Sequence, residues 1–193
     1  MIEGYLALFG FILLMVSTPG PANMVAMLGG AQIGLRGCAG FIVGLVCGKV
    51  LLNSFFGLGF GLFLAEHEMV THALKFMSAG YMIWLATRSW NDNPRTKTDK
   101  HLFDFRHGIV VHPLNPKAWV MVILAWSNFA PAVGAFEAQF IALVFGFAAV
   151  QLIFHSLWCW AGQLLGHAMR GSQRLTRSLI LITVATVIWA LVI

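Results

Sequence analysis

Apolar residues run in long stretches along almost the whole chain, and short polar or basic segments separate these stretches. A helix needs about 20 predominantly apolar residues to cross the hydrocarbon core of a bilayer. Six stretches approach or exceed that length. They cover residues 4–28, 38–64, 72–90, 108–130, 137–162 and 174–193. The pattern predicts an all-α polytopic membrane protein with six transmembrane helices.

The first predicted helix is interrupted at Ser17-Thr18-Pro19-Gly20-Pro21-Ala22-Asn23. A proline ring removes a backbone N–H donor, and the residue before each proline is pushed out of the helical region. Inside a bilayer each unpaired backbone group costs several kcal/mol, so broken backbone persists only where protein or a water-filled cavity surrounds it. The break therefore predicts a polar cavity. A simple kink, or a loop between two short helices, is the alternative.

A second proline segment, His112-Pro113-Leu114-Asn115-Pro116-Lys117, interrupts the fourth predicted helix. Asparagine is a favourable N-cap residue, and proline suits the first helical position after it. The first amides of each half-helix lack intrahelical partners and carry the positive end of the helix dipole, so they attract a carboxylate. The free carbonyls near Ser17 and Thr18 suit an ammonium group. The two ends of a break thus match the two charges of an amino acid. The alternative for Asn115-Pro116 is the start of an ordinary span.

Basic residues set the expected orientation, because cytoplasmic loops of membrane proteins carry an excess of lysine and arginine. Three loops are basic. Their members are Arg36; Arg88, Arg95, Lys97, Lys100 and Arg106; and Arg170, Arg174 and Arg177. The opposite side holds Glu3, Glu66, Glu68 and Glu137, with Lys75 as its basic residue. Both termini are therefore expected outside.

A polar linker at about residues 91–107 divides a single transmembrane domain, 1–193, into two halves of three spans each, 1–90 and 108–193. Because three is odd, homologous halves must enter the membrane in opposite orientations, as in the inverted repeats of many secondary transporters. Weak internal similarity supports this arrangement. Gly44, Lys49 and Asn53 share their spacing with Gly146, Gln151 and His155. We therefore expect two inverted three-helix repeats joined by a cytoplasmic linker.

Composition agrees with a membrane location and excludes several classes of function. The chain is 59% apolar and 10% charged, with a mean hydropathy of +0.82, whereas soluble domains are about 45–50% apolar and about 25% charged. The net charge of +5 does not indicate a nucleic-acid partner, because the basic residues lie in loops between apolar runs. Cys38, Cys47 and Cys159 lack metal-ligand or disulfide spacing, which predicts free thiols. Glu3 and the missing basic n-region favour a retained first span over a signal peptide.

The two proline segments and their surroundings resemble the lysine-exporter superfamily, specifically the LysE/RhtB-type amino-acid exporters, over nearly the whole chain. The similarity rests on Ser17–Asn23, on the glycines Gly40, Gly44 and Gly48, on Lys75–Leu85, and on Leu114–Trp119. The resemblance implies a multi-pass exporter of the bacterial inner membrane that moves amino acids or related small dipolar metabolites outward with the proton-motive force. It also implies an oligomer, with a homodimer expected first, in contact with membrane lipid.

Lys49 lies near the centre of the second predicted span. A cation at that depth costs from about 2.5 to over 10 kcal/mol, so it should face the bundle interior or water. One interpretation is that Lys49 attracts the substrate carboxylate or exchanges a proton; the other is that it snorkels or binds backbone carbonyls. The resemblance implies a variable position, often histidine or acidic, so Lys49 is a departure. A fixed cation disfavours lysine and arginine as substrates and favours neutral or acidic ones.

Proton coupling has few candidate residues, because all seven acidic residues lie at span ends or in loops. His155 and Lys49 are the main candidates, and His112 is a further one. His155 lies one helical turn from Gln151 on a single face. An interhelical hydrogen bond is the alternative role for His155.

The expected substrate site combines both breaks with the buried lysine. Its members are Ser17, Thr18, Pro19, Gly20, Pro21, Asn23, Lys49, Asn115, Pro116 and Lys117. The expected mechanism is alternating access, in which the two halves rock around this site. A cation or metal-ion exporter of the same superfamily is the alternative function, but such a site normally needs carboxylate ligands. An enzyme is not expected, because Ser156 beside His155 forms no recognisable catalytic motif. No catalytic residue, metal site or cofactor is implied.

Overall fold

The computed structural model describes residues 2–60, 67–88, 90, 100–168 and 172–192. In this part of the chain the regular structure is entirely helical, as the apolar pattern predicts. The longer helices are α1 (Ile2–Ser17), α2 (Pro21–Gly37), α3 (Ala39–Phe55), α5 (Glu68–Thr87), α8 (Phe136–Ala168) and α9 (Gln173–Val192). The shorter helices are α6 (Phe105–Val111) and α7 (Pro116–Leu124). Single π or 3-10 turns occupy Phe56–Phe60, Lys100–Phe103, Ala125–Phe129 and Ala130–Ala132.

Both predicted breaks are present. α1 ends at Ser17, α2 begins at Pro21, and the two helices meet at a bend of 50°. α6 ends at Val111, and the helical segment that begins at Pro116 and continues to Ala132 meets it at 54°. Each proline stands in the first turn of the helix it opens, where a missing N–H has no intrahelical partner to lose. The prediction that the first and fourth helices are broken at proline motifs is therefore confirmed.

Membrane-crossing length is reached by two single helices, Ala39–Gly59 and α8. Each of the two bent pairs is also long and apolar enough to cross a membrane when it is counted as one span. The described residues then contain four candidate spans. The third and sixth predicted spans correspond to α5 and α9, which have 20 residues each. Residues 61–64 of the second predicted span and 91–99 of the predicted linker lie outside the described residues. Six spans and an inverted repeat remain predictions.

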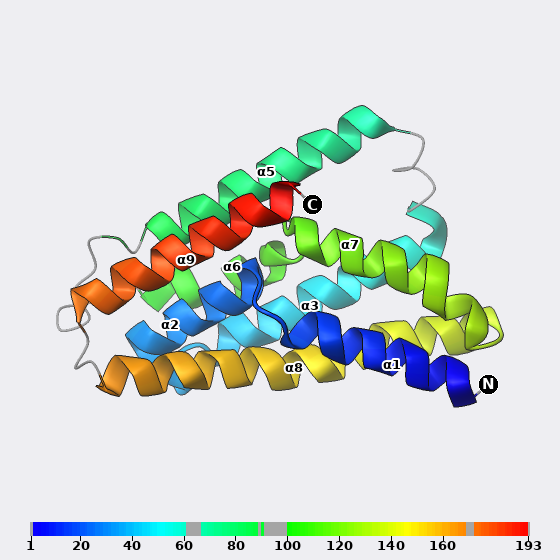
Figure 1. The fold of residues 1–193 in the computed structure, drawn as a ribbon, viewed down its shortest axis with the longest axis horizontal. Helices are drawn as coiled ribbons and strands as arrows, with labels where there is room; N and C mark the ends of the chain where they lie inside the picture. Colours follow the sequence, from blue (N-terminus) through cyan, green and yellow to red (C-terminus); the bar gives the residue numbers. More distant parts are fainter. Residues whose placement is uncertain (1, 61–66, 89, 91–99, 169–171, 193) are drawn as a thin grey trace.

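The helices lie roughly along the long axis of the molecule, and both breaks fall near its middle (Figure 1). In this view α1 and α7 occupy the right-hand part, α2 and α6 the left-hand part, and α8 runs beneath them over almost the full length. α5 and α9 lie side by side above them. The two breaks meet in the interior, because Lys117 is hydrogen-bonded to Thr18 across 99 positions of sequence.

The contact between α2 and α8 depends on glycine. A Cβ atom at Gly30 would overlap the backbone of Cys159, and one at Gly162 would overlap the backbone of Met27. Small residues let helix backbones approach this closely in membrane proteins. The close contact fixes how α8 lies against α2, and these two helices carry much of the site described below.

Polar side chains are gathered inside the bundle, whereas large apolar ones cover its outside. Leu14, Phe145 and Leu152 are exposed, and Phe145 has 65% of its surface accessible. The buried polar residues are Asn23, Lys49, Asn53, His112, Asn115, Gln151, His155, Thr176 and Thr183. Within a bilayer, polar groups face the bundle interior and apolar groups face lipid. The protein is therefore built as a multi-pass membrane protein.

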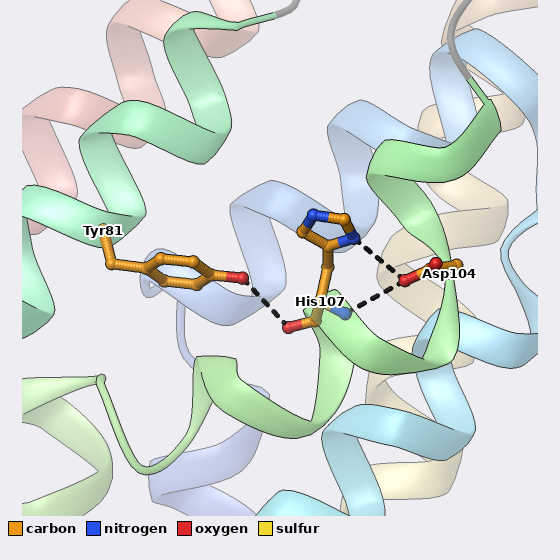
Figure 2. A network of polar contacts seen from close by, with 3 residues as sticks. All are labelled: Tyr81, Asp104 and His107. Carbon is orange, nitrogen blue, oxygen red and sulfur yellow. Dashed lines mark hydrogen bonds and ion pairs between the residues drawn. The ribbon is translucent and has the colours of Figure 1, made fainter.

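The start of α6 is fixed by Asp104. Its carboxylate accepts hydrogen bonds from the backbone N–H of His107 at 3.0 Å and from the ring Nδ1 of His107 at 2.9 Å (Figure 2). Tyr81 of α5 donates to the carbonyl of His107 at 3.4 Å, which ties α5 to α6. Burial acts to raise the pKa of Asp104, but the bonds from His107 and its charge outweigh burial and hold that pKa below its usual value.

Candidate functional site

A small polar cavity lies where the two breaks meet. It is lined by Met15, Val16, Gly20, Ala22, Asn23, His112, Asn115, Lys117, Met121, Gln151 and His155. These residues come from α1, α2, α8 and both sides of the second break, so both halves of the chain contribute. The cavity has a volume of about 20 Å³, which is room for about one water molecule. A cavity with polar residues in its wall is therefore present at the first break, as predicted, in a form that we call closed because it is too small for an amino acid.

Asn23 joins the first turn of α2 to the end of α1. Its side-chain Nδ2 donates to the carbonyl oxygens of Val16 and Thr18, at 2.9 Å each. The last carbonyls of a helix have no intrahelical partner, and Asn23 satisfies two of them. Both amide hydrogens are used in this way, so Oδ1 of Asn23 is left as an acceptor.

Two buried histidines extend this network from α8 to the second break. Nδ1 of His155 lies 2.8 Å from Oδ1 of Asn23, and Nε2 of His155 lies 3.1 Å from Nε2 of His112. The acceptor on Asn23 requires a proton on Nδ1 of His155. With both rings neutral, Nε2 of His155 is then an acceptor and Nε2 of His112 is the donor. The hydrogen bonds therefore run in one direction, from His112 through His155 to Asn23.

This direction leaves Nδ1 of His112 as an acceptor. Nδ1 of His112 and Oε1 of Gln151 are both buried and have no hydrogen-bond partner among the described residues. Buried polar groups are nearly always hydrogen-bonded. Because His112 and Gln151 both line the cavity, these two atoms are candidate contacts for a ligand that donates hydrogen bonds.

Lys117 connects the second break to the first. Asn115 caps α7 by accepting a bond from the backbone N–H of Lys117 at 3.1 Å. The Nζ atom of Lys117 donates to the carbonyl of Thr18 at 3.1 Å, to Oγ1 of Thr18 at 2.8 Å and to the carbonyl of Pro19 at 3.1 Å. An ammonium group has three donors, and all three are used. The aliphatic stem passes over Gly20, where a Cβ atom would lie 2.8 Å from Cδ of Lys117.

Lys49 is fully buried behind the cavity wall. Its Nζ atom donates to the carbonyl of Ala118 at 3.2 Å and lies 4.2 Å from the ring centroid of Phe147. One carbonyl and one aromatic face are its described partners, although an ammonium group has three donors. In this closed form the geometry is that of the second interpretation of Lys49, in which it binds backbone carbonyls.

The structure brings five predicted residues into the cavity wall. They are Gly20, Asn23, Asn115, Lys117 and His155. Thr18 and Pro19 touch this group through the oxygen atoms that bind Lys117. Ser17, Pro21, Lys49 and Pro116 lie beside the cavity without lining it. That these residues bind the substrate stays a prediction.

Gln151 and His112 were missing from the predicted binding set, although both line the cavity. The sequence contains a feature that could have assigned each of these two residues to the site. Gln151 precedes His155 by one helical turn, so the two share a face of α8. His112 opens the second proline segment and was considered only for proton transfer. Met15 and Met121 also line the cavity, and as apolar residues in apolar runs they give no such signal.

Comparison with known proteins places the chain among translocators. The LysE type translocator family matches residues 12–193. The chain is 24% identical over 165 residues to an uncharacterized membrane protein of Vibrio cholerae serotype O1, covering 82% of this chain and 80% of that protein. It is 23% and 22% identical over 164 residues to the homoserine/homoserine lactone efflux proteins of Salmonella typhi and Salmonella typhimurium, with the same coverage of 82% and 80%. No solved structure matches the chain.

Proposed function

Because this chain belongs to the LysE type translocator family, as its proline segments predict, we propose that it exports amino acids or related small dipolar metabolites across the bacterial inner membrane. Two of its relatives are named for the efflux of homoserine and homoserine lactone. Members of the family are transporters, so the protein moves a small molecule and is not an enzyme.

The cavity between the two breaks is the observation that carries this proposal. At the first break, the amide end of α2 faces the carbonyl end of α1. A helix N-terminus attracts a carboxylate, and free carbonyl oxygens attract an ammonium group. The two charges of an amino acid therefore find complementary groups within one short segment. Gln151 and His112 add acceptors in the cavity wall that have no partner among the described residues.

The charges around the cavity favour a neutral or acidic substrate. Lys117 lines the cavity, Lys49 lies behind it, and the wall contains no aspartate or glutamate. Like charges repel strongly where the surroundings have a low dielectric constant. Lysine and arginine are therefore poor substrates in this proposal. The same repulsion argues against the alternative function, a cation or metal-ion exporter.

Transport requires the cavity to open, because a volume of about 20 Å³ is room for about one water molecule and not for an amino acid. We assign this opening to alternating access. In this mechanism the two inverted three-span halves rock against each other, and the site faces the cytoplasm and the outside in turn. The site lies near the middle of the long axis (Figure 1), where such a motion exposes it from either end.

Proton influx drives the outward step, and the histidine pair provides the proton site. A proton that arrives on Nδ1 of His112 makes that ring a donor at both nitrogens. His112 can then pass its Nε2 proton to Nε2 of His155, which is 3.1 Å away. The resulting imidazolium of His155 keeps its Nδ1 bond to Asn23. Lys49 remains the second coupling candidate, as a buried cation able to release a proton.

Orientation and assembly complete the proposal. The excess of lysine and arginine in the loops expected to be cytoplasmic supports an orientation with both termini outside. A homodimer is the proposed assembly, and Gly44 and Gly48 of α3 do not supply its interface. A Cβ atom at Gly44 or Gly48 would overlap the backbone of α6 in the same chain, at Phe105 or Ile109. These glycines therefore serve packing within one protomer.

The experiment that tests export is an efflux screen. Purified protein is reconstituted into lipid vesicles loaded with a mixture of amino acids, a proton gradient is imposed, and the compounds that leave are measured. Selective efflux of neutral or acidic amino acids that stops with an uncoupler is the expected result. Protein-free vesicles give the background. Efflux of a divalent cation instead, with every amino acid retained, would favour the ion-exporter alternative.

A further inference from the structure

The carbonyl end of α1 forms a receptor for an ammonium group, which we call the cradle and define as Thr18 O, Thr18 Oγ1 and Pro19 O. All three atoms accept a hydrogen bond from Nζ of Lys117, at 3.1, 2.8 and 3.1 Å. Three acceptors match the three donors of an ammonium group. The carbonyls expected to receive the ammonium group of a substrate are therefore occupied by a side chain of the protein.

We propose that Lys117 is a tethered stand-in for the ammonium group of the substrate, and that the α-ammonium of an amino acid displaces it from the cradle on binding. The inference rests on the proposed export function. It narrows the substrate to amino acids with a free α-amino group and excludes N-acylated derivatives.

Displacement of Lys117 also supplies space. Its stem is part of the cavity wall and passes over Gly20. When the ammonium group leaves the cradle, the stem leaves the wall with it, and the cavity extends to the cradle oxygens. The added space lies between the amide end of α2, which suits the carboxylate of a substrate, and the carbonyl end of α1, which suits its ammonium group.

The exchange breaks one of the connections between the two halves of the transporter. The cradle belongs to the first half and Lys117 to the second, 99 positions away in sequence. Their three hydrogen bonds connect the halves only while Lys117 fills the cradle. The ammonium group of a free amino acid fills the same cradle without that connection. Substrate binding therefore releases this connection between the halves, which the unloaded carrier keeps.

The cradle is tested first without any transported substrate. Lys117→Met keeps the stem and removes the ammonium group, so n-propylammonium chloride should bind the open cradle and raise the Tm of the detergent-purified variant. Wild-type protein has a filled cradle, and the double variant T18V/K117M lacks one cradle oxygen, so both should show a smaller rise. Sodium chloride at equal concentration controls for ionic strength. An equal Tm shift in the three proteins, or none in Lys117→Met, would overturn the cradle as an ammonium site. Lys117→Gln replaces Lys117→Met if that variant fails to insert.

The substrate class is tested by transport in the same vesicles as the efflux screen, with L-homoserine as the first probe. If Lys117 fills the cradle for nine-tenths of the time or more, its removal should lower the half-saturation concentration about tenfold or more. N-acetyl-L-homoserine, which has no ammonium group, should show no gain. A higher half-saturation concentration in Lys117→Met, with normal values in Lys117→Arg, would mean that Lys117 binds the carboxylate, and the proposal would be wrong. If the screen finds no amino acid exported, the export function fails, whereas the propylammonium result still decides the cradle.

Discussion

His112 and His155 face each other in the interior with their Nε2 atoms 3.1 Å apart. His112 is 3% exposed and His155 is 2% exposed, and they come from different segments, the second break and α8. Two imidazolium rings at this distance repel each other, so the pair holds one added proton far more readily than two. A site that binds a single proton is what a one-proton exchange mechanism requires.

The first prediction concerns this pair. His155→Gln removes the ring that accepts the proton from His112, so efflux driven by a pH gradient should be lost. Exchange of labelled for unlabelled substrate across the vesicle membrane needs no net proton movement and should persist. Both rates are measured in proteoliposomes, with His167→Gln at an exposed position of α8 as the control. Gradient-driven efflux at the wild-type rate in His155→Gln would remove His155 from the coupling path.

Asn23 supports the first break, and its removal should destabilise the protein. In Asn23→Ala the carbonyl of Val16 and Nδ1 of His155 lose a buried partner, whereas the carbonyl of Thr18 keeps its bond from Lys117. Each buried polar group left unpaired costs about 1–3 kcal/mol, so we expect a loss of at least about 2 kcal/mol in the free energy of unfolding. Denaturant unfolding of the detergent-purified variant measures this loss. The exposed Asn128→Ala should change stability little; an equal loss in both variants would contradict the prediction.

Glycine packing between α2 and α8 gives a third prediction. Gly162→Ala places a Cβ atom against the backbone of Met27, where neither helix can yield without moving away. Overpacking of this kind costs about 1–3 kcal/mol. Gly10→Ala is the matched control, because a Cβ atom there meets nothing within 4 Å. Because Gly10 is an exposed helical position, Gly10→Ala should raise the free energy of unfolding by up to about 1 kcal/mol. Thermal unfolding of the two variants in detergent should therefore shift in opposite directions.

The fourth prediction is a pH dependence at the start of α6. The pKa of Asp104 is lowered from its usual value of 3.8 in the folded protein, so the carboxylate stabilises the fold above that value, and the contribution is lost as the pH falls through the lowered pKa. Asp104→Ala should cost about 1 kcal/mol at neutral pH through the lost N-cap. The side chain is 37% exposed, so charge adds little to this cost. Chemical unfolding from about pH 7 to about pH 3 should show the difference between the two proteins shrinking with acid. A difference that stays constant or grows would contradict this account.

The two breaks could be predicted from the sequence because proline acts locally. Pro19 and Pro21 end one helix and open another whatever surrounds them, and Asn115-Pro116 carries its own N-cap. The same reasoning placed a polar cavity at the first break. Apolar stretches of sufficient length likewise predicted the helices that contain the breaks.

Other parts of the site depend on packing between distant helices, which no local pattern encodes. Lys117 meets Thr18 only because the start of α7 lies against the end of α1, so its role at the cradle could not be foreseen. His112 was assigned by its chemistry alone, and its contact with His155 depends on the position of α8. Lys49 was expected in the substrate site, and its contacts in the closed form, with Ala118 of α7 and Phe147 of α8, depend on the packing of those two helices against α3.

Lys49 gives the last prediction, which separates transport from stability. Its ammonium group has one backbone acceptor in the closed form, so two donors are available to a substrate carboxylate when the halves move. Lys49→Met should therefore abolish efflux. Replacing a buried charge by an apolar side chain of similar size is often neutral or stabilising by about 1–4 kcal/mol, so Tm should hold or rise and the variant should reach the membrane in normal amounts. Efflux is measured per amount of inserted protein, with the exposed Arg36→Gln as control. Efflux at the original rate would show that Lys49 only binds backbone, and lost efflux with a lower Tm would point to a role in holding α3 against α7.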